Sequence, residues 1–176
     1  TEITQEAGLQ TDFYGTGVTV ADYDADGHLD VFIGSVEGNR LFRNLGDGRF
    51  EDATKRAGVA GGEETWSTSA AFADLDGDGD LDLFVANYER WSPKIAADVD
   101  YRLTGVGRAY GPFTDISVAA GLEIRNDASG VPVGKGLGVA PVDLDGDRRL
   151  DLMVANDTVR IFLFHNLGDG TFEEVV

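Results

Sequence analysis

The sequence predicts an all-β protein built from about three four-stranded antiparallel units of the β-propeller blade type. Three observations lead to this prediction. A loop rich in aspartate occurs three times, each copy lies between two short apolar runs, and no segment has a sustained helical period. Equivalent glycines, Gly8, Gly58 and Gly121, lie 50 and 63 positions apart, and repeats of this length are typical of propellers and solenoids.

The strands of each unit follow from its apolar runs and turns. A first, inner strand is expected just before each aspartate loop, and a second strand just after it. A third strand, such as residues 40–44, leads into an Asn-Leu-Gly-Asp-Gly turn, and a fourth strand follows around Phe50 and its equivalents, Phe113 and Phe172. Residues 54–59 have room for at most one helical turn. The predicted first strands are 17–21, 69–73 and 137–142, and the predicted second strands are 29–35, 81–87 and 150–156.

The domain organisation is a single repeat segment over residues 1–176. It divides into a tail of a preceding blade, residues 1–9, and units at approximately 10–59, 60–122 and 123–176, with an insertion in the second unit within 88–112. Three units are too few to close a ring of roughly four to eight blades. The segment is therefore expected to be part of a larger propeller or of an assembly of copies, with residues 1–9 and 172–176 pairing with β-structure outside this chain.

The composition excludes several classes of function. Lys and Arg total 14 and Asp and Glu total 32, for a formal net charge of −18, so neither nucleic acid nor an anionic membrane surface is expected as a partner. The absence of cysteine excludes disulfides and thiolate metal sites, and no apolar stretch has the length of a membrane span. Asp outnumbers Glu by 22 to 10 beside 24 glycines, which indicates tight turns and loops for hard cations.

The three aspartate loops share one spacing. Counted from the first Asp of each loop, carboxylates occupy positions 1, 3, 5 and 9. Four carboxylates crowded into so short a loop repel one another unless a cation lies between them. Hard oxygen donors select Ca²⁺ over Zn²⁺ or copper, and Mg²⁺ is less suited because it demands strict octahedral geometry. A single loop of this kind could be an ordinary Asp-Gly turn, but three copies in the same strand context favour metal binding.

Up to three Ca²⁺ sites are therefore predicted. Position 7, which is His28, Asp80 and Arg149, is expected to contribute only its backbone carbonyl. Position 12 is an apolar strand residue, so the loops are not EF-hands, and the Asp at position 9 must supply the bidentate ligand. Arg148 and Arg149 depart from the pattern and are expected to weaken the third site. The expected carboxylate ligands are Asp22, Asp24, Asp26 and Asp30 in loop one, Asp74, Asp76, Asp78 and Asp82 in loop two, and Asp143, Asp145, Asp147 and Asp151 in loop three.

These Asp-x-Asp-x-Asp-Gly-x-x-Asp loops between two strands resemble the FG-GAP or VCBS repeats of calcium-binding β-propellers. The run Asn-Arg-Leu-Phe-Arg-Asn-Leu-Gly-Asp-Gly-Arg-Phe-Glu-Asp-Ala-Thr at 39–54 is similar, more narrowly, to the cartilage-acidic-protein and UnbV-type secreted proteins. The resemblance implies a secreted, extracellular or periplasmic, seven-bladed propeller with Ca²⁺ at the blade loops. It also implies a role in adhesion, in matrix or carbohydrate contact, or as a non-catalytic module beside an enzyme.

The leading functional prediction is a non-enzymatic Ca²⁺-binding repeat segment for extracellular adhesion, scaffolding or recognition of a protein or carbohydrate partner. A lectin-like module is the alternative, with sugar rings stacked on Trp66, Trp91, Tyr101 or Tyr110, although packing between blades is preferred for Trp66. An enzyme is the third hypothesis. The two histidines, His28 and His165, have no evident Ser or Cys partner, so a catalytic triad is unsupported and no catalytic residue is predicted.

Overall fold

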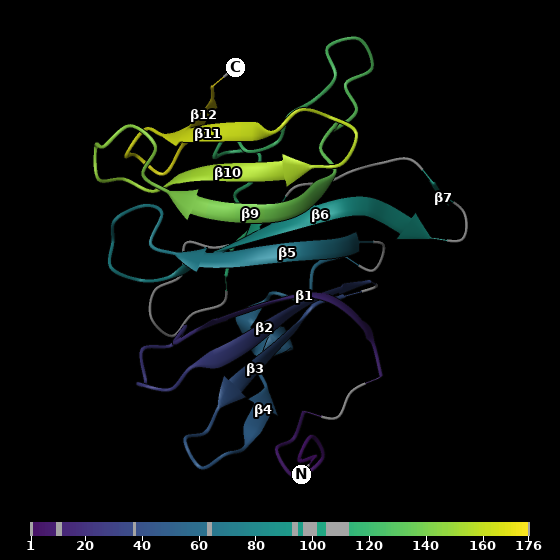
Figure 1. Cartoon of the computed structure of the whole chain (residues 1–176), viewed down its shortest axis with the longest axis vertical. Helices are drawn as coiled ribbons and strands as arrows, with labels where there is room; N and C mark the ends of the chain where they lie inside the picture. The colour runs from purple at the N-terminus through teal and green to yellow at the C-terminus, as the bar shows by residue number, and fades with distance from the viewer. Residues whose placement is uncertain are drawn as a thin grey trace.

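The described part of the chain is almost entirely β-structure. The computed structural model describes residues 2–9, 12–36, 38–62, 65–92, 95–96, 102–104 and 113–175. These residues form strands β1 to β12 and one four-residue helix, α1, arranged as three units in a row (Figure 1). The predicted all-β class is confirmed. The described helix is far too short to cross a lipid bilayer.

The first unit is an antiparallel meander of four strands, as predicted. Its elements are β1 (Tyr14–Ala21), β2 (Asp30–Val36), β3 (Arg40–Asn44), β4 (Phe50–Asp52) and α1 (Thr54–Ala57). In one row of the sheet, Val31 of β2 pairs with Val20 of β1 on one side and with Phe42 of β3 on the other. The helix gives the single turn expected after the fourth strand, and Gly58 ends it in the left-handed conformation at φ 74°.

The third unit repeats this meander. It consists of β9 (Gly136–Val142), β10 (Asp151–Asn156), β11 (Phe162–Asn166) and β12 (Phe172–Glu174), in the sheet order β12-β11-β10-β9. Leu152 of β10 pairs with Pro141 of β9 and with Phe164 of β11, which matches the register around Val31 in the first unit. The sequence repeat is thus also a structural repeat.

The second unit differs from the other two in its later strands. It contains β5 (Thr65–Ala73), β6 (Asp82–Ser92), β7 (Ile95–Ala96) and β8 (Arg102–Thr104). The prolonged end of β6 pairs with β7 inside the predicted insertion, and the start of β6 pairs with β8, the expected third strand. The predicted fourth strand around Phe113 is not formed by the described residues, since Phe113 and Thr114 lie in no strand and Asp115 forms only an isolated β-bridge. The segment that would fold this stretch back onto β8, residues 105–112, lies outside the described part.

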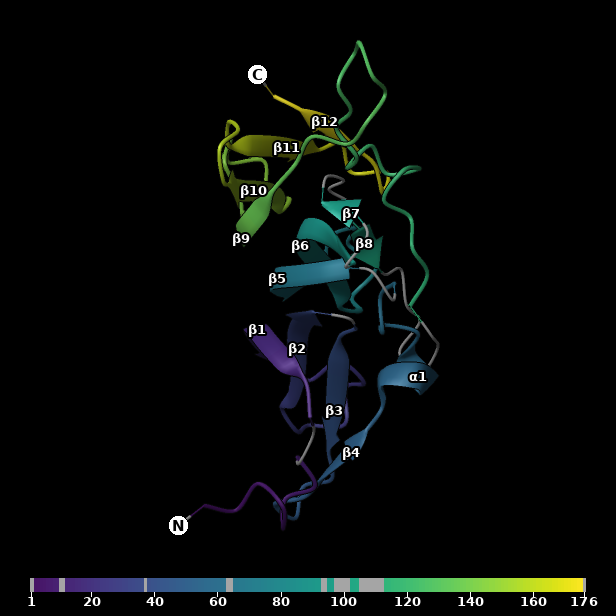
Figure 2. The same ribbon diagram turned by 90° about the vertical axis from the view of Figure 1, so that its right-hand side faces the viewer.

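The inner strands β1, β5 and β9 lie side by side and join the units (Figures 1 and 2). The hydroxyl of Thr16 in β1 donates to the Ser67 carbonyl of β5, and the hydroxyl of Thr68 in β5 donates to the Gly136 carbonyl of β9 at 2.5 Å. The two described ends of the chain lie at opposite ends of the row. The described units therefore form an open row of propeller-like blades rather than a closed ring.

Two apolar cores separate the three units, and β6 contributes to both. Side chains alternate between the two faces of a strand, so Leu83 and Val85 pack with Phe32 and Leu41 of the first unit. Phe84 and Ala86 face the other way and belong to the cluster of the third unit. The second unit is buried on both sides, which explains the continuous apolar run of β6.

A hydrogen bond at each unit boundary holds an equivalent phenylalanine, Phe50, Phe113 or Phe172, to the tail of the preceding unit. The tails are residues 4–8, the α1 segment and residues 117–121, all of them turns or a short helix. The tail carbonyls of Ala7, Ala57 and Ala120 accept 2.8 Å bonds from the amides of Phe50, Phe113 and Phe172, respectively. The described residues 2–9 thus contact β4 of this chain through a turn. Pairing of 1–9 and 172–176 with structure outside the chain stays a prediction.

Gly121 is required at its position because of this boundary contact. It has φ +76°, and a Cβ there would lie 2.5 Å from the Phe172 carbonyl oxygen. Gly121→Ala should lower the free energy of unfolding by about 3 kcal/mol, since left-handed strain and a steric clash combine. Gly130→Ala is the matched control, because Gly130 has φ +67° with no atom within 4 Å of the new Cβ. Urea unfolding should give the control a loss of about 1 kcal/mol, and equal losses for both variants would contradict the contact argument.

Candidate metal centre

The three aspartate loops lie along one side of the molecule, where each inner strand turns into the second strand (left in Figure 1). Loop one joins β1 to β2, loop two joins β5 to β6, and loop three joins β9 to β10. The first Asp follows directly after the inner strand, and the Asp at position 9 is the first residue of the second strand, as in Asp30, Asp82 and Asp151. The strands thus fix both ends of every loop.

The carboxylate at position 1 shapes each loop by accepting the amide of position 6. This bond is 2.8 Å from Gly27 to Asp22, 3.2 Å from Gly79 to Asp74 and 3.0 Å from Arg148 to Asp143. Position 6 has a positive φ in all three loops: 90° at Gly27, 93° at Gly79 and 73° at Arg148. Arg148 is therefore held in a left-handed conformation that favours glycine, so the arginine at this position places backbone strain in loop three.

Positions 5 and 9 carry two further bonds that recur in every loop. The position 5 carboxylate accepts the position 7 amide, at 3.0 Å from His28, 2.9 Å from Asp80 and 2.8 Å from Arg149. The position 9 carboxylate accepts the position 2 amide, at 3.1 Å from Tyr23 and 2.9 Å from both Leu75 and Leu144. Position 9 is also buried in all three loops. Its aspartate closes the loop as well as offering a carboxylate.

Most of the predicted carboxylate ligands come together in three sets. Within each set, one ligand atom from every residue lies within 4.8 Å of the others. Asp26, Asp82 and Asp151 fall outside these three sets; Asp26 pairs with an arginine described below, and Asp151 belongs to a fourth set. The sets are Asp22, Asp24 and Asp30 in loop one, Asp74, Asp76 and Asp78 in loop two, and Asp143, Asp145 and Asp147 in loop three.

His165 joins a fourth set that the sequence analysis did not predict. Its Nδ1 lies 3.1 Å from Asp151 Oδ1 and 3.5 Å from Asp145 Oδ2, and these three residues meet the same 4.8 Å criterion. His165 is in β11, the third strand of its unit, and reaches loop three from the neighbouring strand. Its alignment with Arg43 beside the same kind of turn was the available signal, because a residue there points at the loop in both units.

In loops one and three, the side chains at position 7, His28 and Arg149, pack on the hairpin turn between the third and fourth strands. A Cβ at Gly46 would lie 2.4 Å from His28 Nε2, and a Cβ at Gly168 would lie 3.0 Å from Arg149 Cδ. Arg149 Nε also donates to the Asn166 carbonyl at 2.9 Å. These contacts give the His28 and Arg149 side chains a packing role, and they explain why glycine occupies the turn.

Loop two carries the least compensated charge. Burial raises the pKa of Asp82 to about 7, and the nearby carboxylates of Asp76, Asp78 and Asp74 raise it further against the lowering effect of the Leu75 amide. Burial also raises the pKa of Asp76, again with repulsion from neighbouring carboxylates. No described lysine or arginine forms an ion pair with this loop. A divalent cation would remove the repulsion that raises these pKa values.

Loop three is better compensated at the same position. Burial acts to raise the pKa of Asp151, but hydrogen bonds from the Asn166 and Leu144 amides and from His165 outweigh it, so the net shift is downward. Asp147 forms an ion pair with the Arg149 guanidinium. The same aspartate pattern therefore sits in two different electrostatic environments.

The residues of loop one fit a hard divalent cation. Asp24 is only 7% exposed, and its Oδ1 accepts no hydrogen bond from any described residue. A buried carboxylate oxygen without a hydrogen-bond donor is costly, and a cation is the usual partner for such an oxygen. The side-chain donors of loops one and two are all carboxylate oxygens, which suit Ca²⁺. A bound ion would supply positive charge at the centre of the loop.

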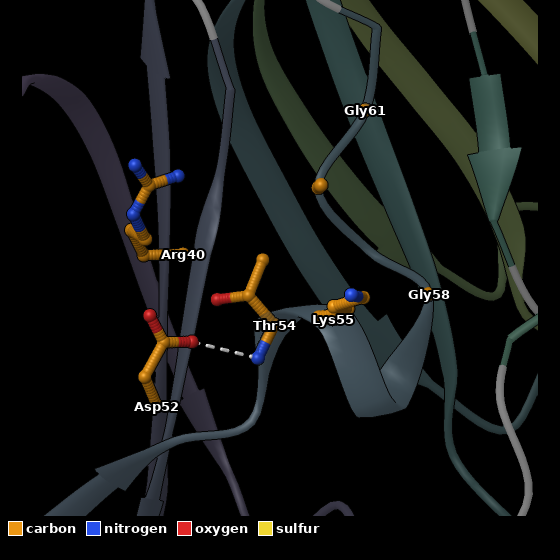
Figure 3. A pocket seen from close by; sticks show the side chains of 7 residues that line it. Arg40, Asp52, Thr54, Lys55, Gly58 and Gly61 are labelled. Atoms are coloured by element: carbon orange, nitrogen blue, oxygen red, sulfur yellow. Dashed lines mark hydrogen bonds between the residues drawn. The ribbon is translucent and has the colours of Figure 1, made fainter.

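A separate pocket of about 710 Å³ lies between β3, β4 and α1, away from the loops (Figure 3). Arg40, Asp52 and Lys55 give it a polar rim, and Asp52 accepts the Thr54 amide at 2.8 Å. Its lining also includes Gly58, Ala60 and Gly61, and no aromatic side chain among the described lining residues. It therefore offers no ring on which a sugar could stack.

Of the aromatic residues proposed for sugar binding, only Trp66 has a described side chain. Its ring packs on Tyr88 with centroids 5.3 Å apart; this contact lies within the second unit, so packing of Trp66 between blades stays a prediction. Trp91 lies at the end of β6 without a described side chain, and Tyr101 and Tyr110 lie outside the described residues. The lectin-like alternative is therefore not decided by these contacts.

Comparison with known sequences supports the resemblance stated above. A family model described as an FG-GAP-like repeat matches residues 22–85, which begin at loop one and include loop two. Cartilage acidic protein 1 of Xenopus tropicalis is 31% identical over 150 residues, which make up 81% of this chain and 21% of that protein. The human protein of the same name is 28% identical over 170 residues, 89% of this chain and 24% of that protein. The chain thus spans about a quarter or less of these relatives.

A solved structure supports the fold. The structure of a lectin from Agrocybe aegerita, which specifically recognises non-reducing terminal N-acetylglucosamine, matches with a TM-score of 0.51 at 19% sequence identity. The match covers 99% of this chain and 42% of that chain. At so low an identity, the likeness concerns the arrangement of the strands alone.

Proposed function

We propose that this chain, whose residues 22–85 match an FG-GAP-like repeat family model, is a non-enzymatic, Ca²⁺-binding propeller segment that serves adhesion, scaffolding or recognition outside the cell. One observation carries the proposal. The carboxylates at positions 1 and 3 come together in all three loops, and the buried Asp24 Oδ1 accepts no hydrogen bond from any described residue. Such an arrangement is costly without a cation and favourable with one.

The bound ions would act on structure rather than on chemistry. Each loop joins an inner strand to a buried second strand, so a cation there would stiffen the connection and fix the blade edge. The formal net charge of −18 favours a partner with a basic or neutral surface, and it disfavours nucleic acid. Extracellular Ca²⁺ would keep such loops filled, which agrees with the proposed secreted, extracellular or periplasmic location. The partner itself is proposed to be a protein or a carbohydrate.

Calcium should raise the melting temperature of the protein. Free Ca²⁺ at 100 times the dissociation constant of one site adds about 2.7 kcal/mol to the free energy of unfolding. For a chain of 176 residues this corresponds to an increase of roughly 5–10 °C per site. Differential scanning calorimetry with Ca²⁺, with Mg²⁺ and with EDTA measures the effect. The same melting temperature in Ca²⁺ as in EDTA would contradict the proposal.

A pair of variants assigns the effect to the loops. Asp76→Asn removes one carboxylate of the loop-two set and should reduce the Ca²⁺-dependent increase in melting temperature. Asp127→Asn changes an exposed aspartate outside every set and should leave the increase as it is. Equal effects of the two variants would show that net charge, rather than the loop, responds to Ca²⁺.

A lectin-like function is the second candidate, supported by the fold it shares with the Agrocybe aegerita lectin. Titration calorimetry with N-acetylglucosamine separates the two candidates, because sugar binding with millimolar or tighter affinity would favour the lectin-like function. Heat from Ca²⁺ alone, with none from the sugar, would favour the scaffold.

A further inference from the structure

The guanidinium of Arg43 in β3 reaches the first aspartate loop from the side and pairs with its carboxylates. Arg43 Nε lies 2.5 Å from Asp24 Oδ2, and Arg43 Nη2 lies 2.5 Å from Asp26 Oδ2. Glu51 of β4 lies 3.7 Å from Nη1 on the other side of the guanidinium. Two of the four loop-one carboxylates predicted as Ca²⁺ ligands are thus paired with one arginine.

The strand register places Arg43 against the loop. Asn44, the next residue of β3, donates its amide to Asp30 Oδ1 at 2.7 Å, which fixes the end of β3 beside the last Asp of the loop. Asn166 makes the equivalent 2.8 Å bond to Asp151 Oδ1 in the third unit. The residue before each asparagine therefore faces its loop, and this residue is Arg43 in the first unit and His165 in the third.

The third-strand residue that faces the aspartate loop differs in charge from unit to unit. Arg43 brings a permanent positive charge to loop one, whereas His165 brings an imidazole nitrogen to loop three. In the second unit the residue after β8 in the sequence is Gly105, which lies outside the described residues and has no side chain. Loop two is also the loop without an ion pair to any described lysine or arginine.

Pairing by Arg43 leaves loop one incompletely satisfied. Asp24 Oδ2 faces the guanidinium, but the buried Oδ1 of the same carboxylate has no hydrogen-bond donor among the described residues. Asp22, Asp24 and Asp30 still lie within 4.8 Å of one another at their ligand atoms. The loop therefore keeps a group of oxygens for a cation while an arginine neutralises part of its charge.

We propose that Arg43 competes with divalent cations for the carboxylates of loop one and so gives this loop a lower Ca²⁺ affinity than loop two. The inference rests on the proposed function, since it concerns the Ca²⁺ affinity of the same loops. A cation that enters loop one meets the positive charge of Arg43 and competes with its charge-assisted bonds to Asp24 and Asp26, whereas no described cationic side chain pairs with loop two. The three loops then fill at different Ca²⁺ concentrations rather than together.

Site-resolved NMR tests this proposal in the whole chain. The amides of Gly27 and Gly79 are equivalent, because each donates to the first Asp of its loop, and they report loops one and two separately. In the unchanged protein, Ca²⁺ should shift the Gly79 signal at a lower concentration than the Gly27 signal. Arg43→Gln should lower the midpoint at Gly27 about tenfold and leave the midpoint at Gly79 in place.

Two further variants separate charge from packing. Arg49→Gln removes an exposed arginine that pairs only with Asp47 in the neighbouring hairpin turn, and it should change neither midpoint. Arg43→Lys keeps the charge without the forked donors and should give a Gly27 midpoint between those of the unchanged protein and Arg43→Gln. An Arg43→Gln midpoint at Gly27 that is unchanged or higher, while Gly79 still responds, would overturn the role of Arg43 alone. No response at either glycine in any variant would overturn the proposed function and the role of Arg43 together.

Discussion

Asp151→Ala should lower the free energy of unfolding by about 3 kcal/mol even when no metal is bound. The Asp151 carboxylate is 1% exposed and accepts the amides of Leu144 at 2.9 Å and of Asn166 at 2.8 Å, with His165 Nδ1 at 3.1 Å. Alanine would leave the buried Asn166 amide and the partly buried Leu144 amide without their acceptor, and the loss of an acceptor for a buried amide costs about 1–3 kcal/mol. Because Asp151 links loop three to β11, the loss reaches beyond the loop itself.

Urea unfolding in EDTA measures this effect without the contribution of calcium. Arg149→Ala is the matched control from the same loop. Its side chain is 42% exposed, so the loss of its ion pair with Asp147 and of its hydrogen bond to the Asn166 carbonyl should cost only about 1 kcal/mol. A loss for Arg149→Ala as large as that for Asp151→Ala would show that the loop is sensitive to any change, against a specific role for the position 9 carboxylate.

Asp82 occupies the same loop position as Asp151, but its carboxylate should destabilise the metal-free protein at neutral pH, whereas that of Asp151 stabilises it. Its folded-state pKa is raised from 3.8 to about 7, mainly by burial, so the folded protein binds a proton that the unfolded chain has already released between these values. The free energy of unfolding therefore falls as the pH rises through this window, by about 4 kcal/mol if the shift is fully realised. Above pH 7 the charged carboxylate is buried at full cost in the metal-free protein.

Asp82→Asn isolates this contribution, since the amide oxygen can still accept the Leu75 amide that Asp82 accepts at 2.9 Å. In EDTA at pH 7.5 the variant should be more stable than the unchanged protein by about 2–4 kcal/mol, and the two should converge near pH 4. In excess Ca²⁺ the order should reverse, because the cation stabilises the carboxylate and not the amide. Parallel curves of stability against pH for both proteins in EDTA would contradict the assignment.

The strand order and the loops could be predicted from sequence because both depend on short-range patterns. Each unit contains one loop with Asp at positions 1, 3, 5 and 9, and an apolar run lies on each side of it. The strands β1, β2 and β3 could therefore be predicted from one short segment of the chain. The fourth strand of the second unit was predicted by analogy with Phe50, but in the described residues Phe113 lies in no strand and Asp115 forms only an isolated β-bridge.

The contacts between strands could not be predicted in the same way. Arg43 and His165 reach their loops from a neighbouring strand, and a spacing rule along the chain does not register such a contact. Asp82 and Asp151 are the same residue type at the same loop position, yet their pKa values shift in opposite directions. The difference arises from burial, from amide donors and from one histidine, which only the folded arrangement brings together.

The bonds from the Ala7, Ala57 and Ala120 carbonyls to the Phe50, Phe113 and Phe172 amides have a consequence for how such a chain can be cut or extended. In each unit, the phenylalanine amide donates to a carbonyl in the turn or helix that precedes the first strand of that unit. A complete blade therefore begins at this preceding segment and not at its first strand. A truncation just before β1 would keep every strand of the first blade and still remove the acceptor of Phe50. In the evolution of such arrays, a duplicated blade therefore keeps the acceptor of its phenylalanine amide only if it is copied together with the turn that comes before it.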